Sequence, residues 1–205
     1  MKVSKYNNSV TKRLLDILLS ILILILSAPL FVLTSFLVLL TSGLPVFYVQ
    51  NRTGKNGKTF KIFKFRTMIN GADKLQKRFA KLNESSGVVF KIRNDPRFTK
   101  IGKVISSVGI DELPQFINVL KGDMSIVGPR PLPTYEADRL SSKQKVRELI
   151  RPGITSTWVI NGTHQLAFNE WMALDKKYIH DASIEQDLKI IFSTLILMLQ
   201  FLLKL

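Results

Sequence analysis

The chain has 205 residues, no cysteine, and 30 lysines and arginines against 15 aspartates and glutamates, which gives a formal net charge of +15. This length suits one ordinary domain plus a membrane element, and the lack of cysteine excludes disulfides and thiolate metal sites. The excess positive charge needs a negative partner. Nucleic acid, anionic lipid headgroups and phosphorylated substrates all remain open on composition alone.

The first predicted element is a membrane segment. Leu14 to Leu40 is a nearly unbroken apolar run with Asp16 as its single charge, and its length is that of a membrane element. A secretory signal would have an apolar region of roughly 7–15 residues that ends in a small-residue cleavage site. Because the run continues past Pro29, we favour a membrane helix over a signal peptide or a buried soluble helix.

Ser27 and Pro29 mark the expected kink of this helix, because a proline removes a backbone hydrogen bond and presses on the preceding turn. The arm from Leu14 to Ala28 would extend about 22 Å, short of a hydrocarbon core of roughly 30 Å. Cations flank both ends, namely Lys2, Lys5, Lys12 and Arg13 before it and Arg52, Lys55, Lys58, Lys61, Lys64 and Arg66 after it. The positive-inside rule therefore favours a re-entrant helix over the alternative, a kinked spanning anchor.

Residues 45–50 and 59–65 are rich in β-forming residues and enclose a turn with Gly54 and Gly57, so we predict a β-hairpin. Cations and aromatic residues mix in its second strand, which is compatible with nucleobase stacking and equally with a solvated edge strand. Further along we predict a polar helix at 73–83, a loop at 84–87, a short strand at 88–92, a turn at 94–97 and a basic helix at 142–150. His164 and His180 are isolated and are interpreted as non-catalytic.

Site-like chemistry concentrates between Gly109 and Leu132. Pro114 suits the first position of a helix, and apolar residues recur with helical spacing at Leu113, Phe116, Ile117 and Leu120. Asp111 and Glu112 would then lie at the positive end of a short amphipathic helix, a location that favours carboxylates and attracts phosphates. The alternative is that the acidic pair only complements the helix dipole.

The last predicted element is an amphipathic helix over 184–205, with a polar stripe made of Glu185, Lys189, Ser193, Gln200 and Lys204. Such a helix can lie in the headgroup region of a membrane, and the alternative is a helix packed on the protein's own core. The sequence thus divides into a basic start with a membrane helix at 1–42, a cytosolic catalytic domain at 43–183, and an interfacial helix at 184–205.

A series of motifs carries a family resemblance over nearly the whole chain. In order they are Pro-Val-Phe-Tyr-Val-Gln-Asn-Arg (45–52), Phe-Lys-Phe-Arg-Thr-Met (63–68), Asp-Pro-Arg-Phe-Thr-Lys-Ile-Gly (95–102), Asp-Glu-Leu-Pro-Gln (111–115), Gly-Pro-Arg-Pro (128–131) and Arg-Pro-Gly-Ile-Thr (151–155). The chain resembles the bacterial sugar transferases, the monotopic polyprenyl-phosphate phosphoglycosyl transferases, in their minimal catalytic form.

The resemblance implies a mostly helical α+β fold with a re-entrant N-terminal helix, a small β-hairpin and interfacial helices, held on the cytoplasmic face of a bacterial membrane. Such enzymes transfer a sugar-1-phosphate from a UDP-sugar to a polyprenyl (undecaprenyl) phosphate, release UMP, and initiate exopolysaccharide, capsule or glycoconjugate assembly. The expected partners are therefore the UDP-sugar, the polyprenyl phosphate and an anionic lipid bilayer, and not nucleic acid. A homo-oligomer stays open, because the sequence does not disclose the oligomeric state.

By the same resemblance, Asp111 would be the nucleophile of a covalent Asp-phosphosugar intermediate and a ligand of Mg²⁺, and Glu112 its acid–base partner. Arg130 would grip phosphate oxygens with its planar fork. Further substrate-binding members would be Lys64, Arg66 and Asp123.

The chain departs from the family at two positions where a basic residue is usual, because it has Ser106 and Thr163 there. Lys103 and His164 are candidate substitutes. These departures leave open a catalytically weakened adaptor or regulator of the same fold. The intact acidic pair argues against the adaptor. A membrane-tethered nucleic-acid binder is a third hypothesis, which the motif series argues against.

Overall fold

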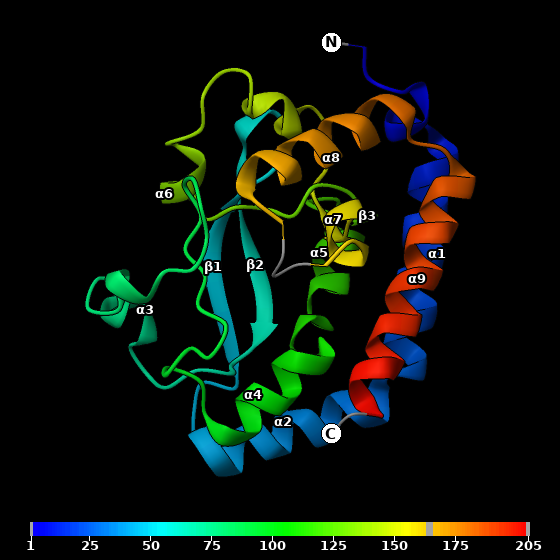
Figure 1. The fold of residues 1–205 in the computed structure, drawn as a ribbon. Helices are drawn as coiled ribbons and strands as arrows, with labels where there is room; N and C mark the ends of the chain where they lie inside the picture. Colours follow the sequence, from blue (N-terminus) through cyan, green and yellow to red (C-terminus); the bar gives the residue numbers. More distant parts are fainter. Residues whose placement is uncertain (1, 163–165, 204–205) are drawn as a thin grey trace.

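The computed structural model describes residues 2–162 and 166–203 as a mostly helical α+β fold (Figure 1). The longer helices are α1 (Val10–Leu26), α2 (Ala28–Ser42), α4 (Lys100–Val108), α5 (Gln115–Lys121), α8 (Phe168–Asp181) and α9 (Ile184–Leu202). Short helices are α3 (Ala72–Leu75), α6 (Thr134–Ala137) and α7 (Thr157–Ile160), and the strands are β1 (Phe47–Thr53), β2 (Thr59–Phe65), β3 (Ser125–Val127) and β4 (Gly153–Thr155). This confirms the predicted mostly helical α+β class.

The hydrophobic N-terminal region consists of two helices that meet at Ser27 with a bend of 63°. The N–H of Ser27 still donates to the carbonyl of Ile23 at 2.8 Å, and Pro29 lies in the first turn of α2, where its missing N–H removes no hydrogen bond. Within residues 2–162 and 166–203, no single helix has the length and apolar character to cross a membrane, whereas α1 and α2 taken together meet both criteria.

Two small sheets lie inside the helices. β1 and β2 form the predicted hairpin, which is antiparallel and runs in register from Phe47 opposite Phe65 to Thr53 opposite Thr59. β3 and β4 form a parallel pair. One hydrophobic core joins these sheets to the flanking helices, because Val38 of α2 and Ile190 of α9 are buried in the same cluster as the strand residues. The segments 1–42 and 184–205 thus contribute to the core of the middle segment.

Buried polar side chains attach α1 to this core. The ammonium of Lys12 lies 2.5 Å from the carboxylate of Asp187 on α9 and donates to the carbonyl of Val127 at 3.3 Å. One turn later, Asp16 accepts hydrogen bonds at 3.0 Å from the hydroxyl of Ser125 and the N–H of Ile126. Two side chains of the hydrophobic helix therefore bind the backbone and side chains of β3.

The outer face of α9 is apolar and exposed, although its inner face packs on the core through Asp187 and Ile190. Exposed apolar residues of this helix include Leu188, Phe192, Leu195 and Leu199. The alternative description, a helix packed on the protein's own core, therefore holds for the inner face, while the location of the outer face in a membrane stays a prediction. Of its predicted polar stripe, Lys204 lies outside the described residues.

Three local predictions between the hairpin and α8 are wrong. Residues 88–92 form no strand, because the N–H groups of Phe90 and Lys91 donate to the side chains of Glu136 and Asn83 rather than to a neighbouring strand. The polar helix predicted at 73–83 is reduced to α3 and a 3₁₀ turn at Ala80–Leu82, and the helix at 142–150 is a 3₁₀ turn at Lys145–Leu149. Short helices without a continuous apolar stripe gain little from packing, which explains both reductions.

Gly102 on α4 allows this helix to touch the chain that leaves β2. A Cβ atom built on Gly102 would lie 1.9 Å from the carbonyl oxygen of Thr67. We expect Gly102→Ala to destabilise the protein by about 1–3 kcal/mol, because backbone must move to relieve the overlap. Thermal unfolding in detergent measures this, with Lys100→Ala, on the exposed face of the same helix, as the control. Equal midpoints for both variants would contradict the close contact.

Candidate active site

The acidic pair lies on a 3₁₀ turn, Ile110–Glu112, that links α4 to α5. Gly109 ends α4 with a φ of +81°, a conformation that favours glycine, and α5 begins at Gln115. The two carboxylates therefore precede α5 by a turn and do not lie within its first helical positions. Asp111 is buried, and Glu112 is partly exposed on the same side of the turn.

Two cations from distant parts of the chain converge on this pair. Lys64 of β2 places its ammonium 2.6 Å from Oε1 of Glu112 and 3.5 Å from Oδ2 of Asp111. Arg130 places Nη2 at 2.7 Å from the same Oε1 of Glu112. The structure therefore brings together four of the predicted site residues. It also distinguishes the two carboxylates, since Glu112 holds both cations while Asp111 accepts one long hydrogen bond.

The electrostatics separate the two acids further. Burial raises the pKa of Asp111 to about 6, and the charge of Glu112 adds to this rise while Lys64 opposes it. Burial acts on Glu112 in the same direction, but the charges of Arg130 and Lys64 outweigh it and hold the pKa of Glu112 below its usual range. Neighbouring carboxylates that titrate as a coupled pair divide into one that ionises early and one that ionises late. Here Glu112 is the member that ionises at the lower pH.

The raised pKa of Asp111 makes stability depend on pH. A carboxylate with a folded pKa of about 6 and an unfolded pKa of 3.8 destabilises the fold progressively as pH rises from 3.8 to 6. We therefore expect Asp111→Asn to be more stable than the wild type, by about 2–4 kcal/mol at pH 7 without divalent metal and by about 1 kcal/mol less at pH 5. Chemical denaturation in EDTA at the two pH values measures the difference. A difference that grew toward pH 5 would contradict the assigned shift.

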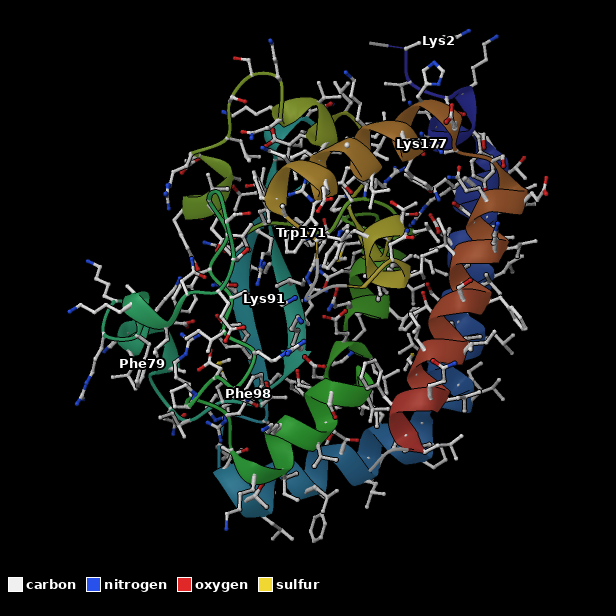
Figure 2. The ribbon with its side chains drawn as sticks, viewed as in Figure 1. Lys2, Phe79, Lys91, Phe98, Trp171 and Lys177 are labelled. Carbon is white, nitrogen blue, oxygen red and sulfur yellow. The ribbon has the colours of Figure 1, made fainter. Side chains whose placement is uncertain are left out.

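The acidic pair and its cations line a cleft of about 1620 Å³. Among the described residues, its lining includes eight basic and four acidic side chains, so an anion is favoured over a cation. Lys91 lies on its wall with its ammonium 5.6 Å from the ring of Trp171 (Figure 2). The lining also includes large apolar side chains from the hairpin and from α9, namely Phe47, Phe65, Ile191, Leu195, Met198 and Phe201. The combination suits a ligand with a charged head and an apolar body.

The other predicted site residues do not join the acidic pair. Arg66 lines the cleft, but its guanidinium donates to the carbonyls of Ser42, Gly43 and Leu44, where it completes the end of α2. Asp123 lies beyond the opposite end of α5, where its carboxylate is 3.4 Å from the amide of Asn118.

Of the two departures from the family pattern, Ser106 lies on the cleft wall. The candidate substitute Lys103 is exposed and donates to Asn94 at 3.1 Å. Thr163 and His164 fall outside the described residues. His180 is exposed beside Asp181, away from the cleft lining.

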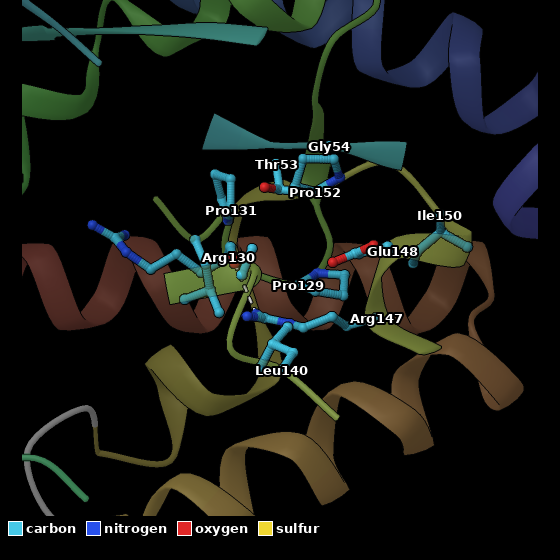
Figure 3. Close-up of a pocket in the computed structure, with 12 residues that line it drawn as sticks. Thr53, Gly54, Pro129, Arg130, Pro131, Leu140, Arg147, Glu148, Ile150 and Pro152 are labelled. Atoms are coloured by element: carbon cyan, nitrogen blue, oxygen red, sulfur yellow. Dashed lines mark hydrogen bonds between the residues drawn. The ribbon is translucent and has the colours of Figure 1, made fainter. Parts of the chain in front are cut away.

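Arg130 is presented by the Gly-Pro-Arg-Pro segment that follows β3. Its carbonyl accepts a 2.7 Å hydrogen bond from the guanidinium of Arg147 (Figure 3). The carbonyl of the next residue, Pro131, accepts one from Arg52 at 2.9 Å. Sequence reasoning used Arg52 only as a flanking charge and gave Arg147 no role, since the separations of 79 and 17 residues concealed these contacts.

The carboxylate oxygens of the acidic pair are of the kind that a divalent cation such as Mg²⁺ prefers. In the part of the chain that the structure describes, no group of three or more histidine, cysteine or acidic side chains gathers to hold a metal alone. Mg²⁺ in phosphate-transferring sites is commonly held by one or two carboxylates together with phosphate oxygens of the substrate. Asp111 and Glu112 can supply the protein's share of such a site.

Comparison with known proteins gives a consistent result. The family model of the bacterial sugar transferases matches residues 7–201. The chain is 44% identical over 196 residues to galactosyl transferase CpsE of Streptococcus agalactiae and 39% identical over 190 residues to exopolysaccharide production protein ExoY of Sinorhizobium fredii. It is also 39% identical over 196 residues to the UDP-glucose:undecaprenyl-phosphate glucose-1-phosphate transferase of Escherichia coli.

These matches cover 95%, 91% and 91% of the chain in that order. The chain spans 43% of the first relative, 84% of the second and 40% of the third. The family match begins within the 3₁₀ turn Lys5–Asn8 and ends in the last turn of α9. It therefore includes Lys64, Asp111, Glu112 and Arg130. The chain therefore belongs to the bacterial sugar transferase family, as its motifs predicted.

Proposed function

We propose that this protein transfers a sugar-1-phosphate from a UDP-sugar to a polyprenyl phosphate and releases UMP. The observation that carries the proposal is the cluster of Asp111, Glu112, Lys64 and Arg130 in a cleft whose lining includes both cations and large apolar side chains. The E. coli relative is named for a UDP-glucose donor and an undecaprenyl-phosphate acceptor, which supports this substrate class. The product would be the first lipid-linked intermediate of exopolysaccharide, capsule or glycoconjugate assembly.

In this proposal Asp111 is the nucleophile. Its carboxylate oxygen attacks the phosphorus that carries the sugar. The bond from that phosphorus to the bridging oxygen of the diphosphate breaks, and UMP leaves with the bonding electron pair. A phosphate oxygen of the polyprenyl phosphate then attacks the same phosphorus and restores the Asp111 carboxylate. The single long hydrogen bond of Asp111 favours it over Glu112, whose electron pairs are directed to two cations.

Lys64 and Arg130 would stabilise the charge on the transferring phosphoryl group, and Glu112 would orient both of them. The low pKa of Glu112 favours this orienting role over the acid–base role that the family resemblance implied. Mg²⁺, held by Asp111 and Glu112 with phosphate oxygens, would neutralise the diphosphate when bound. Arg66 would act indirectly, by fixing the junction of α2 and β1.

We also propose that the protein is held on the cytoplasmic face of the membrane by the bent pair α1–α2 and the outer face of α9. Large apolar side chains are exposed along all three helices, including Leu18, Ile25, Val32, Leu40, Phe192 and Leu199. Exposed apolar surface of this extent marks a membrane or protein contact, and the net charge of +15 suits anionic headgroups. The apolar side chains that line the cleft would then admit a lipid acceptor directly from the bilayer.

The test is nucleoside monophosphate release by the detergent-purified protein, given Mg²⁺, polyprenyl phosphate and a panel of UDP-sugars. We expect release with at least one donor, and loss of release when EDTA is added or the lipid acceptor is omitted at steady state. With labelled donor and no acceptor, the protein itself should carry the sugar phosphate in a hydroxylamine-sensitive bond. No release with any donor from folded protein would favour an inactive adaptor of the same fold.

A further inference from the structure

The main chain around Arg130 has few N–H groups that can donate hydrogen bonds. Pro129 and Pro131 flank the arginine, and neither proline has an N–H to donate. No helix or strand includes residues 128–132, and Pro133 forms only an isolated antiparallel bridge with Arg52, so no regular ladder fixes the direction in which the arginine leaves the chain. The orientation of Arg130 must therefore be set by groups outside its own segment.

Backbone donors fix the two ends of this segment. The N–H of Gly153 donates to the carbonyl of Pro129 at 2.9 Å, and the N–H of Thr53 donates to the carbonyl of Leu132 at 3.0 Å. The carbonyls of the two residues between them are held by side chains instead. Both donors are guanidiniums, that of Arg147 to the carbonyl of Arg130 (Figure 3) and that of Arg52 to the carbonyl of Pro131.

Arg147 is itself held in place by a buried acid. Its Nε lies 3.1 Å from Oδ2 of Asp175 on α8, and its Nη2 lies 3.0 Å from the same oxygen. The side chains of Arg147 and Asp175 are 5% and 2% exposed, so water does not compete for these bonds. The guanidinium thus joins α8 to the carbonyl of Arg130 through a planar group whose donors have fixed directions.

We infer that Arg147, oriented by Asp175, is a positioning residue for Arg130. It holds the main chain of Arg130 so that the guanidinium of Arg130 meets Glu112 and the substrate phosphates. The expected effect of Arg147 on turnover rests on the proposed function, whereas its positioning of Arg130 does not. Arg147 also lines the cleft, so a direct contact with phosphate is the alternative to an action through the carbonyl of Arg130. If Arg147 acts through that carbonyl, its effect on phosphate handling depends on the side chain at position 130.

A double-mutant cycle tests this dependence. Arg147→Lys keeps a positive charge beside Asp175, so the buried carboxylate remains paired, but a single ammonium cannot reproduce the fixed fork that joins Asp175 to the carbonyl. We expect Arg147→Lys to lower kcat/KM for the UDP-sugar by about 10- to 100-fold in the wild-type background. In the Arg130→Ala background the same substitution should change kcat/KM by less than about twofold.

A second readout separates this inference from the proposed reaction. The same four proteins are compared by their dissociation constants for inorganic pyrophosphate with Mg²⁺, which requires no turnover. We expect the same pattern, with a loss of affinity from Arg147→Lys that disappears when Arg130 is absent. If the wild type releases no monophosphate with any donor, the proposed function fails and this binding cycle alone decides the positioning role.

Arg151→Lys is the matched control, because the guanidinium of Arg151 also donates to a backbone carbonyl, that of Gly122 at 3.0 Å, and does not line the cleft. We expect this variant to leave the pyrophosphate affinity unchanged. Equal fold-changes from Arg147→Lys in both backgrounds would overturn the inference and leave Arg147 a purely structural residue. Wild-type pyrophosphate binding that did not depend on Arg130 would overturn it as well.

Discussion

Replacing Asp111 by asparagine is expected to abolish nucleoside monophosphate release while leaving the protein folded. The asparagine side chain has the same shape but cannot form the acyl phosphate, so kcat should fall on the order of 10⁴-fold or more, as when a covalent nucleophile is removed. Folding should not suffer, because the carboxylate is buried with one long hydrogen bond from Lys64 and is unfavourable in its ionised form. Release assayed over a pH series, with labelling of the protein by the donor, measures both the rate and the intermediate.

The pH series adds a second expectation for the wild type. Protonated Asp111 is not a nucleophile, so turnover should fall as pH decreases through about 6. Asp123→Asn is the matched control, since Asp123 lies beyond the far end of α5 and should be neutral in this assay. Residual labelling of Asp111→Asn at the wild-type level would place the nucleophile elsewhere in the cleft.

Loss of the buried ion pair between α1 and α9 is expected to have the largest effect on stability. Lys12→Ala would leave the carboxylate of Asp187, which is 1% exposed, without its cation. Removing one partner of a buried pair typically costs about 3–5 kcal/mol, because the remaining charge stays out of water. Two tyrosine hydroxyls, Tyr6 and Tyr178, still donate to Asp187 and would offset part of that cost. Equilibrium unfolding in detergent measures the free energy.

Two further variants give this prediction its controls. Lys5→Ala removes an exposed lysine from the 3₁₀ turn Lys5–Asn8, which precedes α1, and should change stability by less than about 0.5 kcal/mol. The double variant Lys12→Met/Asp187→Leu removes both charges and should recover at least half of the loss from Lys12→Ala. A double variant as unstable as Lys12→Ala would mean that packing at these positions, and not the uncompensated charge, sets the cost.

Much of the fold could be predicted because the deciding signals are local. The apolar run with its proline predicted the break between α1 and α2, and the glycines of the turn predicted the hairpin. The parallel pair β3–β4 was missed because each strand has only three residues, too few to show a period. The strand at 88–92 was predicted wrongly because side chains of Asn83 and Glu136 occupy its backbone donors, and sequence spacing does not reveal such competitors.

The site shows the same division. Asp111, Glu112 and Arg130 stood out through motif and spacing, and Lys64 joined them through its place on the hairpin. Arg66 had equally favourable sequence surroundings, yet its guanidinium serves the end of α2. A cation near a site in sequence can be directed to phosphate or to backbone carbonyls, and tertiary contacts decide which. Arg147 escaped notice for the same reason, since its partners come from the Gly-Pro-Arg-Pro segment and from α8.

The bonds from Lys12 and Asp16 to β3 bear on how this protein can be engineered. A soluble form is usually sought by cutting away the hydrophobic segment, here everything before residue 43. Such a cut would remove Asp16, which accepts hydrogen bonds from Ser125 and Ile126 of β3, and Lys12, the cation that pairs with Asp187. It would thus remove support from the strand that leads into the Gly-Pro-Arg-Pro segment. Replacing the exposed leucines of α1 with polar residues, while keeping Lys12 and Asp16, is the route that preserves the enzyme's interior.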